Sequence, residues 1–500
     1  MAAAFFFLLM PFFLVPASTH LQSTEVGFIS AVISEKGLDF AKDILIEKAI
    51  SSLTPLNLPQ IDRVLKIPFV GNVLVGLSNI SIYSVNVPYS NVKSGDTGIA
   101  IVASGATTNL SMNWSYSYTT WFFPVIISDN GHAHVQVEGM EVGLTLGLEN
   151  RQGTLELSIM ECGFYMKDIS ITLDGGASWL YQGLLDVFEE QIKSSVENAI
   201  TNNIKEGIMK LDSLLKTLPV EVSVDEIAAL NVTFVNGPEF SNSSIGFEID
   251  GLFTAAHKGV STGNYFMNSQ PPAFCNCQNK MLEISLDEAV FKSASNVYYN
   301  ADSMQWTVDK VPNPSLLNTA SWKYIVPQLY KMYPNDDMIL NVSLSAPPII
   351  KISPNNIDST VYSDIIIDVL NDNEIIPVAC ISLEVSATGS VDISGNNIVG
   401  NVGLVDFTMS LKWSKIGNFR IYLIQSVMRT LLKTVFFPYV NIRLRRGFPL
   451  PIIRGFTLQN ADICTGSSQI VVCSDVVYAD SNELRLLPYN QIQSFLGFGV

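Results

Sequence analysis

The sequence has little charge, little histidine and few cysteines, and each shortage excludes a class of protein. Charged residues make up 15% of the chain and hydrophobic residues 48%, which excludes a disordered protein and favours much buried or lipid-facing surface. The charges are 46 acidic and 29 basic, and the net charge of -17 argues against a nucleic-acid binder, because phosphates require a basic field. A chain of 500 residues exceeds one ordinary core, so we expect at least two domains.

The motifs of several enzyme classes are also missing. The chain has no G-x-S-x-G elbow, no H-E-x-x-H, no G-x-G-x-x-G and no Walker loop. Its histidines are His20, His132, His134 and His257. His132 and His134 would share one strand face, but two ligands without a third favour a polar hairpin edge over a metal site. Cys275 and Cys277 form a C-x-C without a second cluster, which is weak evidence for zinc. We expect no metal, no cofactor and no enzymatic activity.

The N-terminus carries an apolar run that is too short to cross a membrane. Ala2 to Val15 is interrupted by proline and is typical of a secretory signal peptide that ends near Ala17 or Ser18, although no Lys or Arg precedes the run. No other segment is apolar over a spanning length. We therefore expect a signal peptide at residues 1–18 and a secreted, extracellular protein.

Secretion permits glycans and disulfides, and the sequence offers acceptors for both. The Asn-X-Ser/Thr sequences, whose number is close to chance, lie at Asn79, Asn109, Asn113, Asn231, Asn242 and Asn341. The six cysteines are too sparse for a disulfide scaffold. Cys464 and Cys473 bracket a turn and an outgoing strand, so a hairpin would bring their sulfurs together, and we predict a disulfide between them.

The order of elements is the same in both halves of the chain. We expect helices at residues 36–53, 177–218, 315–333 and 420–437, with short β-rich segments between the members of each pair. Ser34 is placed to cap the first helix, and Pro219 to stop the second. A helix, antiparallel strands and another helix, twice over, predict an α+β fold in which amphipathic helices lie against curved sheets.

One uncharged segment is dense in aromatic residues. Asn113 to Pro124 reads NWSYSYTTWFFP and lies within a run that has no charge from Thr97 to Ser128. Two interpretations remain open: a strand that packs its aromatic side into a core, or a tip that faces lipid, because Trp and Tyr favour membrane interfaces. A glycan at Asn109 or Asn113 would oppose the second. The candidate lipid contacts are Trp114, Tyr116, Tyr118, Trp121, Phe122 and Phe123.

A basic segment stands out in this acidic chain. From Phe407 to Ala461 there is no Asp or Glu, whereas the segment holds Lys412, Lys415, Arg420, Arg429, Lys433, Arg443, Arg445, Arg446 and Arg454. Such a segment suits anionic lipid head groups, for which guanidinium groups are well shaped. The alternative is a solvated helix face whose cations pair with acids elsewhere in the fold. The candidate head-group contacts are Lys433, Arg443, Arg445 and Arg446.

Several stretches spread along the chain match one known family. They are SEKGLDFA at Ser34–Ala41, VEGMEVGLTLGL at Val137–Leu148, SWLYQGLLDVFEEQIKSSVENAI at Ser178–Ile200, and GFPLP at Gly447–Pro451 followed by DVVYA at Asp475–Ala479. With these stretches the chain resembles the family of bactericidal/permeability-increasing protein and lipopolysaccharide-binding protein (BPI/LBP), in particular its plant members. The resemblance covers essentially the whole mature chain.

The resemblance implies an elongated, boomerang-like protein of two barrels, each a twisted antiparallel sheet with a long and a short helix, joined by a central sheet. Residues 19–218 would form the N-terminal lipid-binding barrel, 219–300 the central sheet and linker region, and 301–500 the C-terminal barrel with strands that return to the central sheet. Each barrel is expected to bury acyl chains, at about 0.8 kcal/mol per methylene. The implied function is recognition of bacterial lipopolysaccharide in innate defence.

Two features depart from the family pattern. Lysines are expected on the tip that corresponds to NWSYSYTTWFFP, but the residues here are uncharged, and residues 19–216 hold 12 basic against 21 acidic side chains. This favours the alternative function, a carrier that transfers phospholipid or another membrane lipid. Cys162 matches a disulfide cysteine of the family, but Ile204–Leu218 offers no partner, so that bridge is expected to be absent or rewired. The expected partners are lipopolysaccharide, phospholipid or a membrane surface, with the oligomeric state left open.

Overall fold

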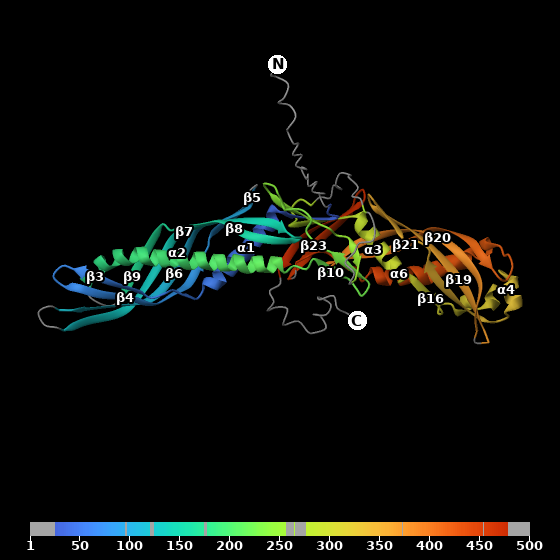
Figure 1. Cartoon of the computed structure of the whole chain (residues 1–500), viewed down its shortest axis with the longest axis horizontal. Coiled ribbons are helices and arrows are strands. Elements are labelled where there is room, and N and C mark those ends of the chain that lie inside the picture. Colours follow the sequence, from blue (N-terminus) through green and yellow to red (C-terminus); the bar gives the residue numbers. More distant parts are fainter. Residues whose placement is uncertain are drawn as a thin grey trace, which may run out of the picture.

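The computed structural model describes residues 26–478 except 96–97, 121–124, 175–177, 257–264, 266–276, 373 and 454, and no side chains from 178 to 187. The molecule is elongated, with the N-terminal half at one end, the C-terminal half at the other, and a sheet between them (Figure 1). This confirms the expected α+β fold of two sheet-and-helix halves joined by a central sheet. The predicted signal peptide lies outside the described residues.

The N-terminal half is built on one large antiparallel sheet. Its strands are β2 (Leu56–Asn57), β3 (Ile61–Ile67), β4 (Gly71–Asn86), β5 (Tyr89–Gly95), β6 (Gly98–Thr119), β7 (Ile126–Arg151), β8 (Thr154–Tyr165) and β9 (Asp168–Asp174). The order is β2-β4-β6-β7-β8, with β3 on β4, β5 on β6 and β9 on β7. Strands β6 and β7, of 22 and 26 residues, pair along most of their length, which makes this half long.

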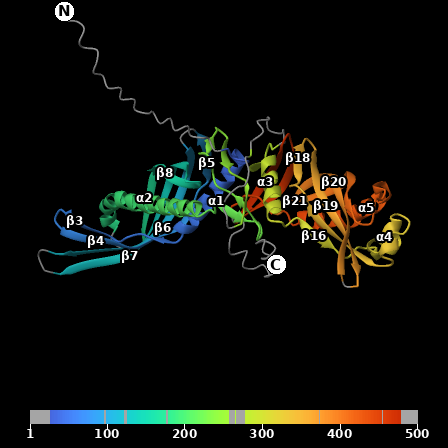
Figure 2. The same ribbon diagram turned by 45° about the vertical axis from the view of Figure 1, so that its right-hand side comes forward.

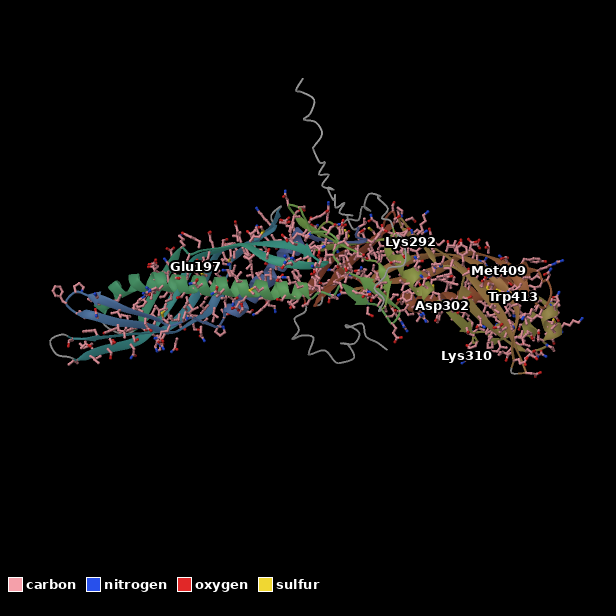
Figure 3. All side chains as sticks on the ribbon, viewed as in Figure 1. Glu197, Lys292, Asp302, Lys310, Met409 and Trp413 are labelled. Carbon is pink, nitrogen blue, oxygen red and sulfur yellow. A yellow bond between two sulfur atoms is a disulfide. The ribbon has the colours of Figure 1, made fainter. Side chains whose placement is uncertain are left out.

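Two helices cover this sheet. Helix α1 (Glu35–Leu53) begins as predicted, because the Ser34 hydroxyl accepts a hydrogen bond from the Gly37 amide at 3.3 Å. Helix α2 (Ser178–Lys216) stops before Pro219, also as predicted. Its buried side chains recur every four residues or so and join the core of the sheet; they are Phe188, Ile192, Val196 and Ile200. Glu197 lies on the exposed face of α2 (Figure 3).

The C-terminal half repeats this plan with a second antiparallel sheet and its own core. Its strands are β16 (Gln305–Val308), β17 (Asp337–Leu344), β18 (Ile349–Ser353), β19 (Asn356–Asn371), β20 (Glu374–Ser394), β21 (Asn397–Ser414) and β22 (Phe448–Pro449). They follow the order β16-β17-β19-β20-β21-β22, with β18 on β19. The figures place the free end of this half opposite the β3–β4 and β6–β7 hairpins (Figures 1 and 2).

The helices of the C-terminal half differ from the prediction. The helix expected at 315–333 is replaced by 3₁₀ turns at Pro314–Leu317 and Thr319–Trp322 and by a short α4 (Pro327–Met332). Asn318 interrupts the expected helix, because its side chain accepts from the Ala320 amide and begins a second 3₁₀ turn, as Asn313 begins the first. The helix expected at 420–437 is longer and interrupted: α5 (Gln425–Leu431), a π turn (Leu432–Phe436) and α6 (Phe437–Leu444). The π turn precedes Pro438, which cannot donate a helical hydrogen bond.

The central sheet joins strands from three parts of the chain. It has the order β12 (Glu239–Phe240), β13 (Ser244–Ile249), β1 (Ile29–Ser34), β15 (Leu282–Asp287), β24 (Gln469–Tyr478) and β23 (Phe456–Thr465). A smaller sheet, β10 (Glu221–Ser223), β11 (Ala228–Asn231) and β14 (Phe253–Ala255), shares its core. Helix α3 (Glu288–Asn300), which the sequence did not lead us to expect, begins at Asp287, whose carboxylate accepts from the Ala289 amide at 2.8 Å.

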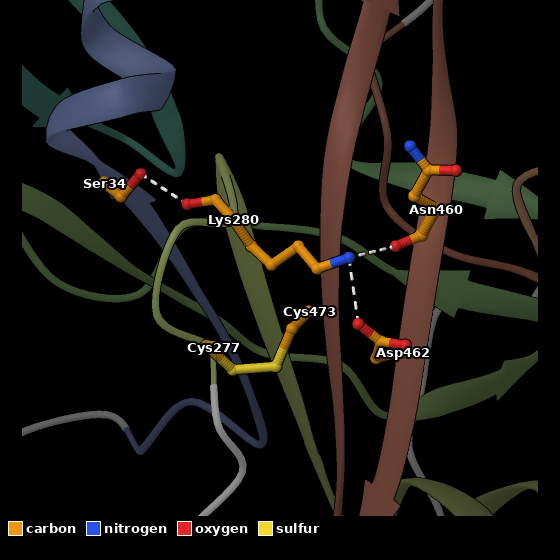
Figure 4. Close-up of a disulfide and its surroundings, with 6 residues drawn as sticks. All are labelled: Ser34, Cys277, Lys280, Asn460, Asp462 and Cys473. Carbon is orange, nitrogen blue, oxygen red and sulfur yellow. Dashed lines mark hydrogen bonds and ion pairs between the residues drawn. A yellow bond between two sulfur atoms is a disulfide. The ribbon is translucent and has the colours of Figure 1, made fainter.

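The disulfide prediction is wrong in its pairing. Cys473 is bonded to Cys277, 196 residues away in sequence, with a Cα–Cα separation of 5.3 Å (Figure 4). In the β23–β24 ladder Cys473 lies opposite Asp462, while Cys464 lies opposite Val471. Cys464 and Cys473 are therefore diagonal rather than facing, a poor geometry for a bridge. Cys464 is disulfide-bonded as well, and Cys162 is a free thiol.

Candidate lipid-contact sites

The first part of the aromatic segment is core. Trp114 is 4% exposed and Tyr116 8%, and both belong to the cluster that includes Ile192 and Val196 of α2. The Trp114 and Tyr116 rings stack 6.0 Å apart, and Trp114 Nε1 donates to the His132 carbonyl at 3.1 Å. These contacts remove Trp114 and Tyr116 from the candidate lipid contacts, and the core interpretation applies to them.

The other aromatic residues of the segment are one half-buried side chain and three that the structure does not describe. Tyr118 is half-buried and lies between Val73 and Ile127 in the sheet. Trp121, Phe122 and Phe123 lie outside the described residues. The strands that flank them, β6 and β7, form one of two hairpins that project at the free end of the N-terminal half (Figures 1 and 2).

The second hairpin, β3–β4, carries an exposed aromatic residue that the sequence analysis did not single out. Phe69 is 100% exposed and has a φ of 66°, a left-handed conformation that bulky side chains rarely adopt. The turn is closed by a hydrogen bond from the Val70 amide to the Ile67 carbonyl at 3.1 Å. The sequence held one signal for this turn, Pro68-Phe69 between two β-rich runs. Proline favours the second position of a type II turn, and the third position of such a turn has a positive φ.

Other large apolar side chains share this end. Val64 and Leu74 are exposed on the β3–β4 hairpin, and Val125 and Ile126 are exposed at the start of β7, Ile126 at 70%. We call Val64, Phe69, Leu74, Val125 and Ile126 the apolar tip. Scattered apolar residues are normal on a surface, but a group of them on two projecting hairpins indicates an interaction site.

The basic segment divides into paired and unpaired cations. Lys412 Nζ lies 2.6 Å from Asp364, and Arg429 lies 3.8 Å from Asp406. Burial tends to raise the pKa of Asp364, but hydrogen bonds from Lys412 and Ser382 lower that pKa overall. Within the described part of the chain, no other cation of the segment forms an ion pair, although the charge of Lys415 acts on Asp368. The ion-pair alternative therefore describes Lys412 and Arg429, but not the candidate head-group contacts.

The candidate head-group contacts do not form one cluster. Lys433 lies on the π turn and lines a hollow beside α5. Arg443, near the end of α6, donates to the Tyr439 hydroxyl at 2.7 Å and lies over that ring at 5.0 Å. Arg445 and Arg446 follow α6 and are exposed. Arg454 lies outside the described residues.

The candidate glycosylation sites differ in accessibility. Asn79 and Asn242 are exposed, Asn79 at an irregularity between β4 and β6. Asn109 is half-buried within β6. The other three are half-buried and have hydrogen-bonded side chains: Asn113 to His132, Asn231 to Thr233 and Asn341 to Asp368.

The described residues give no support to a metal centre or a membrane span. Among them, no three His, Cys, Asp or Glu side chains come together as metal ligands. His132 and His134 lie on one face of β7 as expected, but His132 Nδ1 is 2.7 Å from the Asn113 side-chain oxygen. No helix in the described ranges has both the length and the apolar character needed to cross a membrane.

Comparisons with known proteins place both halves in one family. The chain matches the N-terminal domain of the LBP / BPI / CETP family over residues 37–218 and its C-terminal domain over residues 222–478. It is 54% identical over 480 residues to an Arabidopsis thaliana protein assigned to the BPI/LBP family, covering 96% of this chain and 98% of the relative.

More distant similarities extend to animal proteins. The chain is 26% identical to bactericidal permeability-increasing protein of Sebastes schlegelii, covering 89% of this chain and 94% of the relative. It is also 26% identical to human lipopolysaccharide-binding protein, covering 90% of this chain and 93% of the relative. A crystal structure of lipopolysaccharide binding protein matches the fold with a TM-score of 0.61 at 21% identity, covering 91% of this chain and 99% of that one.

Proposed function

This chain belongs to the LBP / BPI / CETP family, whose fold binds lipid, and from that premise we propose that it is an extracellular, non-enzymatic protein that recognises bacterial lipopolysaccharide in innate defence. Relatives named for lipopolysaccharide binding and for bactericidal activity, each similar over about nine-tenths of the chain, support the proposal. The observation that carries it is the apolar tip.

The apolar tip is suited to enter a lipid layer. Phe69 makes its turn less stable in two ways: its left-handed φ costs about 1–2 kcal/mol, and its exposed ring forgoes the roughly 1.5–3 kcal/mol that burial contributes. Neither cost is offset by packing within the described structure, where the side chain is fully exposed. Insertion of the ring among acyl chains would supply the missing burial, and Ile126 and Val125 on the neighbouring hairpin would follow it.

We propose that acyl chains lie along the edge of the N-terminal sheet next to α2, where apolar side chains are only partly buried. Helix α2 lies along β8 and β9. Exposed and partly buried residues alternate along β9. The partly buried ones are apolar and pack on the N-terminal core: Ile169, Ile171 and Leu173. An acyl chain laid along this edge would be buried at about 0.8 kcal/mol per methylene. We place the acyl chains of the ligand between α2 and β9.

The charge around the tip favours a second candidate function, a carrier of phospholipid or another membrane lipid. The β3–β4 hairpin has exposed Arg63 and Lys66, with Asp62 beside them and Asp129 on β7. This mixed charge provides few cations for the phosphates of lipopolysaccharide. A zwitterionic phospholipid does not require them, because its head group carries no net charge.

Two measurements on the full-length protein separate these candidates. Beads coated with lipopolysaccharide should retain more protein than lipid-free beads, and retention no greater than on lipid-free beads would contradict the first candidate. Mass spectrometry of lipids that co-purify with the protein tests the second. Phospholipid in the purified protein, together with no lipopolysaccharide retention, would favour the carrier over the first candidate, whereas the absence of both retention and bound lipid would contradict both.

A further inference from the structure

A hollow at the C-terminal end of the molecule gathers hydrogen-bond donors. It is a shallow depression, open to solvent, with a volume of ≈ 510 Å³, and it is lined by the exposed side chains of Tyr422, Gln425, Ser426, Arg429, Thr430 and Lys433. The spacing of three and four residues places these side chains on one face of α5 and its flanking turns. Helices α4 and α5 lie together at the end farthest from the apolar tip (Figure 2).

Every side chain that lines the hollow can donate a hydrogen bond, and none is acidic. The Tyr422 hydroxyl accepts from Arg420 Nη1 at 3.1 Å, which leaves its own proton free to donate outward and brings a third cation to the rim. Thr430 donates to the Ser426 carbonyl at 3.0 Å, whereas the hydroxyl of Ser426 and the amide of Gln425 remain available in the described structure.

The positive charge of the hollow is only weakly countered. Residues 407–461 contain no Asp or Glu, so an acidic neighbour must come from another element. Within the described residues, the acidic side chain that pairs with a cation of the hollow is Asp406 on β21, which lies 3.8 Å from Arg429. Arg429 also lies over the Phe407 ring at 5.1 Å, which fixes its guanidinium beside the hollow. Lys433 has no described acidic partner.

We propose that this hollow binds the phosphate monoester of an anionic phospholipid such as phosphatidic acid in a membrane surface. A phosphate monoester offers several acceptor oxygens and a charge near -2, which suits two or three cations beside the free hydroxyl groups of Tyr422 and Ser426. A lipid rather than free phosphate is indicated by the exposed apolar residues at the rim, because Tyr422 is 62% exposed and Leu423 lies next to it, also exposed. These side chains would contact the membrane–water interface around the lipid head group.

The inference rests on the proposed function only in requiring a lipid ligand, and its test uses a separate readout. Binding of the full-length protein is measured on vesicles of phosphatidylcholine and on the same vesicles with phosphatidic acid added; the ratio of the two affinities reports on the hollow. The variant Arg429→Gln with Lys433→Gln removes the two cations that line the hollow and leaves Arg420 at its rim. The control, Lys310→Gln with Lys331→Gln, makes the same change of charge on exposed residues of the C-terminal half that lie outside the hollow and are not candidate head-group contacts.

We expect the hollow variant to lower the affinity ratio about 25-fold, since each cation at an anionic surface contributes about fivefold, and the control to change it little. An equal loss in both variants would overturn the proposal in favour of a general charge effect. An unchanged ratio in the hollow variant, or a wild-type ratio of one, would also overturn it. Inorganic phosphate should not compete at concentrations that match the lipid phosphate; full competition would indicate a free-phosphate site instead. Failure of the proposed function would appear separately, as the absence of lipopolysaccharide retention and of co-purified lipid.

Discussion

The Val70 amide donates a hydrogen bond to the Ile67 carbonyl at 3.1 Å, and this bond closes the turn that holds Phe69 in a left-handed conformation at the end of the molecule. Glycine is the residue that adopts such a conformation without strain. Phe69→Gly should therefore raise the free energy of unfolding by up to about 1 kcal/mol, measured by urea denaturation, because the strain of about 1–2 kcal/mol that it relieves is partly offset by the entropy that glycine loses on folding, about 0.5–1 kcal/mol. A destabilised Phe69→Gly protein would show that the ring packs within the fold.

Trp114 should behave as a core residue. Trp114→Ala removes a buried ring and its hydrogen bond to His132, and we expect a loss of about 3–5 kcal/mol in the free energy of unfolding. Gly131 lies opposite Trp114, and an added Cβ there would meet the Asp174 carbonyl oxygen and lie 2.8 Å from the indole ring, so Gly131→Ala should also destabilise. Unchanged stability with reduced lipid binding would return Trp114 to the lipid contacts.

The Cys277–Cys473 disulfide ties the end of the chain to its middle. It closes a loop of 196 residues, and its removal by Cys277→Ser should cost about 2–5 kcal/mol of stability. Cys162→Ser is the control, because this thiol is free, and it should be close to neutral. Peptide mapping without reductant should recover Cys473 linked to Cys277; recovery of a Cys464–Cys473 peptide would contradict the structure.

The last turns of α2 should contribute stability that depends on pH. Hydrogen bonds from Lys216 and from the Leu157 amide lower the pKa of Asp212 below its ordinary 3.8. A group with a lowered folded-state pKa contributes stability above its unfolded value, and that contribution is lost as pH falls through the folded value. Asp212→Asn should therefore be less stable than wild type at neutral pH, and the difference should shrink below pH 3.8.

Denaturant midpoints over a pH series measure this effect. The control is Glu206→Gln, an exposed residue of α2, for which the difference from wild type should be small at every pH. A difference for Asp212→Asn that stays constant into the acid range would contradict the assigned cause.

Local signals in the sequence identified the elements that depend on few residues. Ser34 and Pro219 predicted where α1 begins and where α2 stops, because a cap and a proline act on the adjacent turn. Helix α3 was not predicted. Its residues include Ser, Asn and Tyr, which are weak helix formers, and it is stabilised by burial against the central sheet.

The sequence did not allow us to predict features that depend on contacts between distant segments, such as the burial of a side chain or the partner of a cysteine. The alternating aromatics of β6 predicted a strand, but Trp114 is buried because side chains of β4, β7 and α2 join it in one core. The partner of Cys473 depends on how the segment before β15 meets β24, which no spacing rule encodes. Phe69 was overlooked because its exposure follows from the projection of a hairpin beyond the sheet, and its own neighbours are ordinary apolar residues.

The most direct test of the account compares lipid binding by the wild type, by Phe69→Ser with Ile126→Ser, and by Tyr89→Ser. Tyr89 is a matched control because it is exposed at 71% on β5, away from the apolar tip (Figure 1). With folding verified by circular dichroism, the double variant should bind lipopolysaccharide and phosphatidylcholine vesicles at least about tenfold more weakly, since burial of a Phe side chain contributes roughly 1.5–3 kcal/mol. The Tyr89 variant should bind like the wild type. Equal binding by all three proteins would contradict the role of the apolar tip.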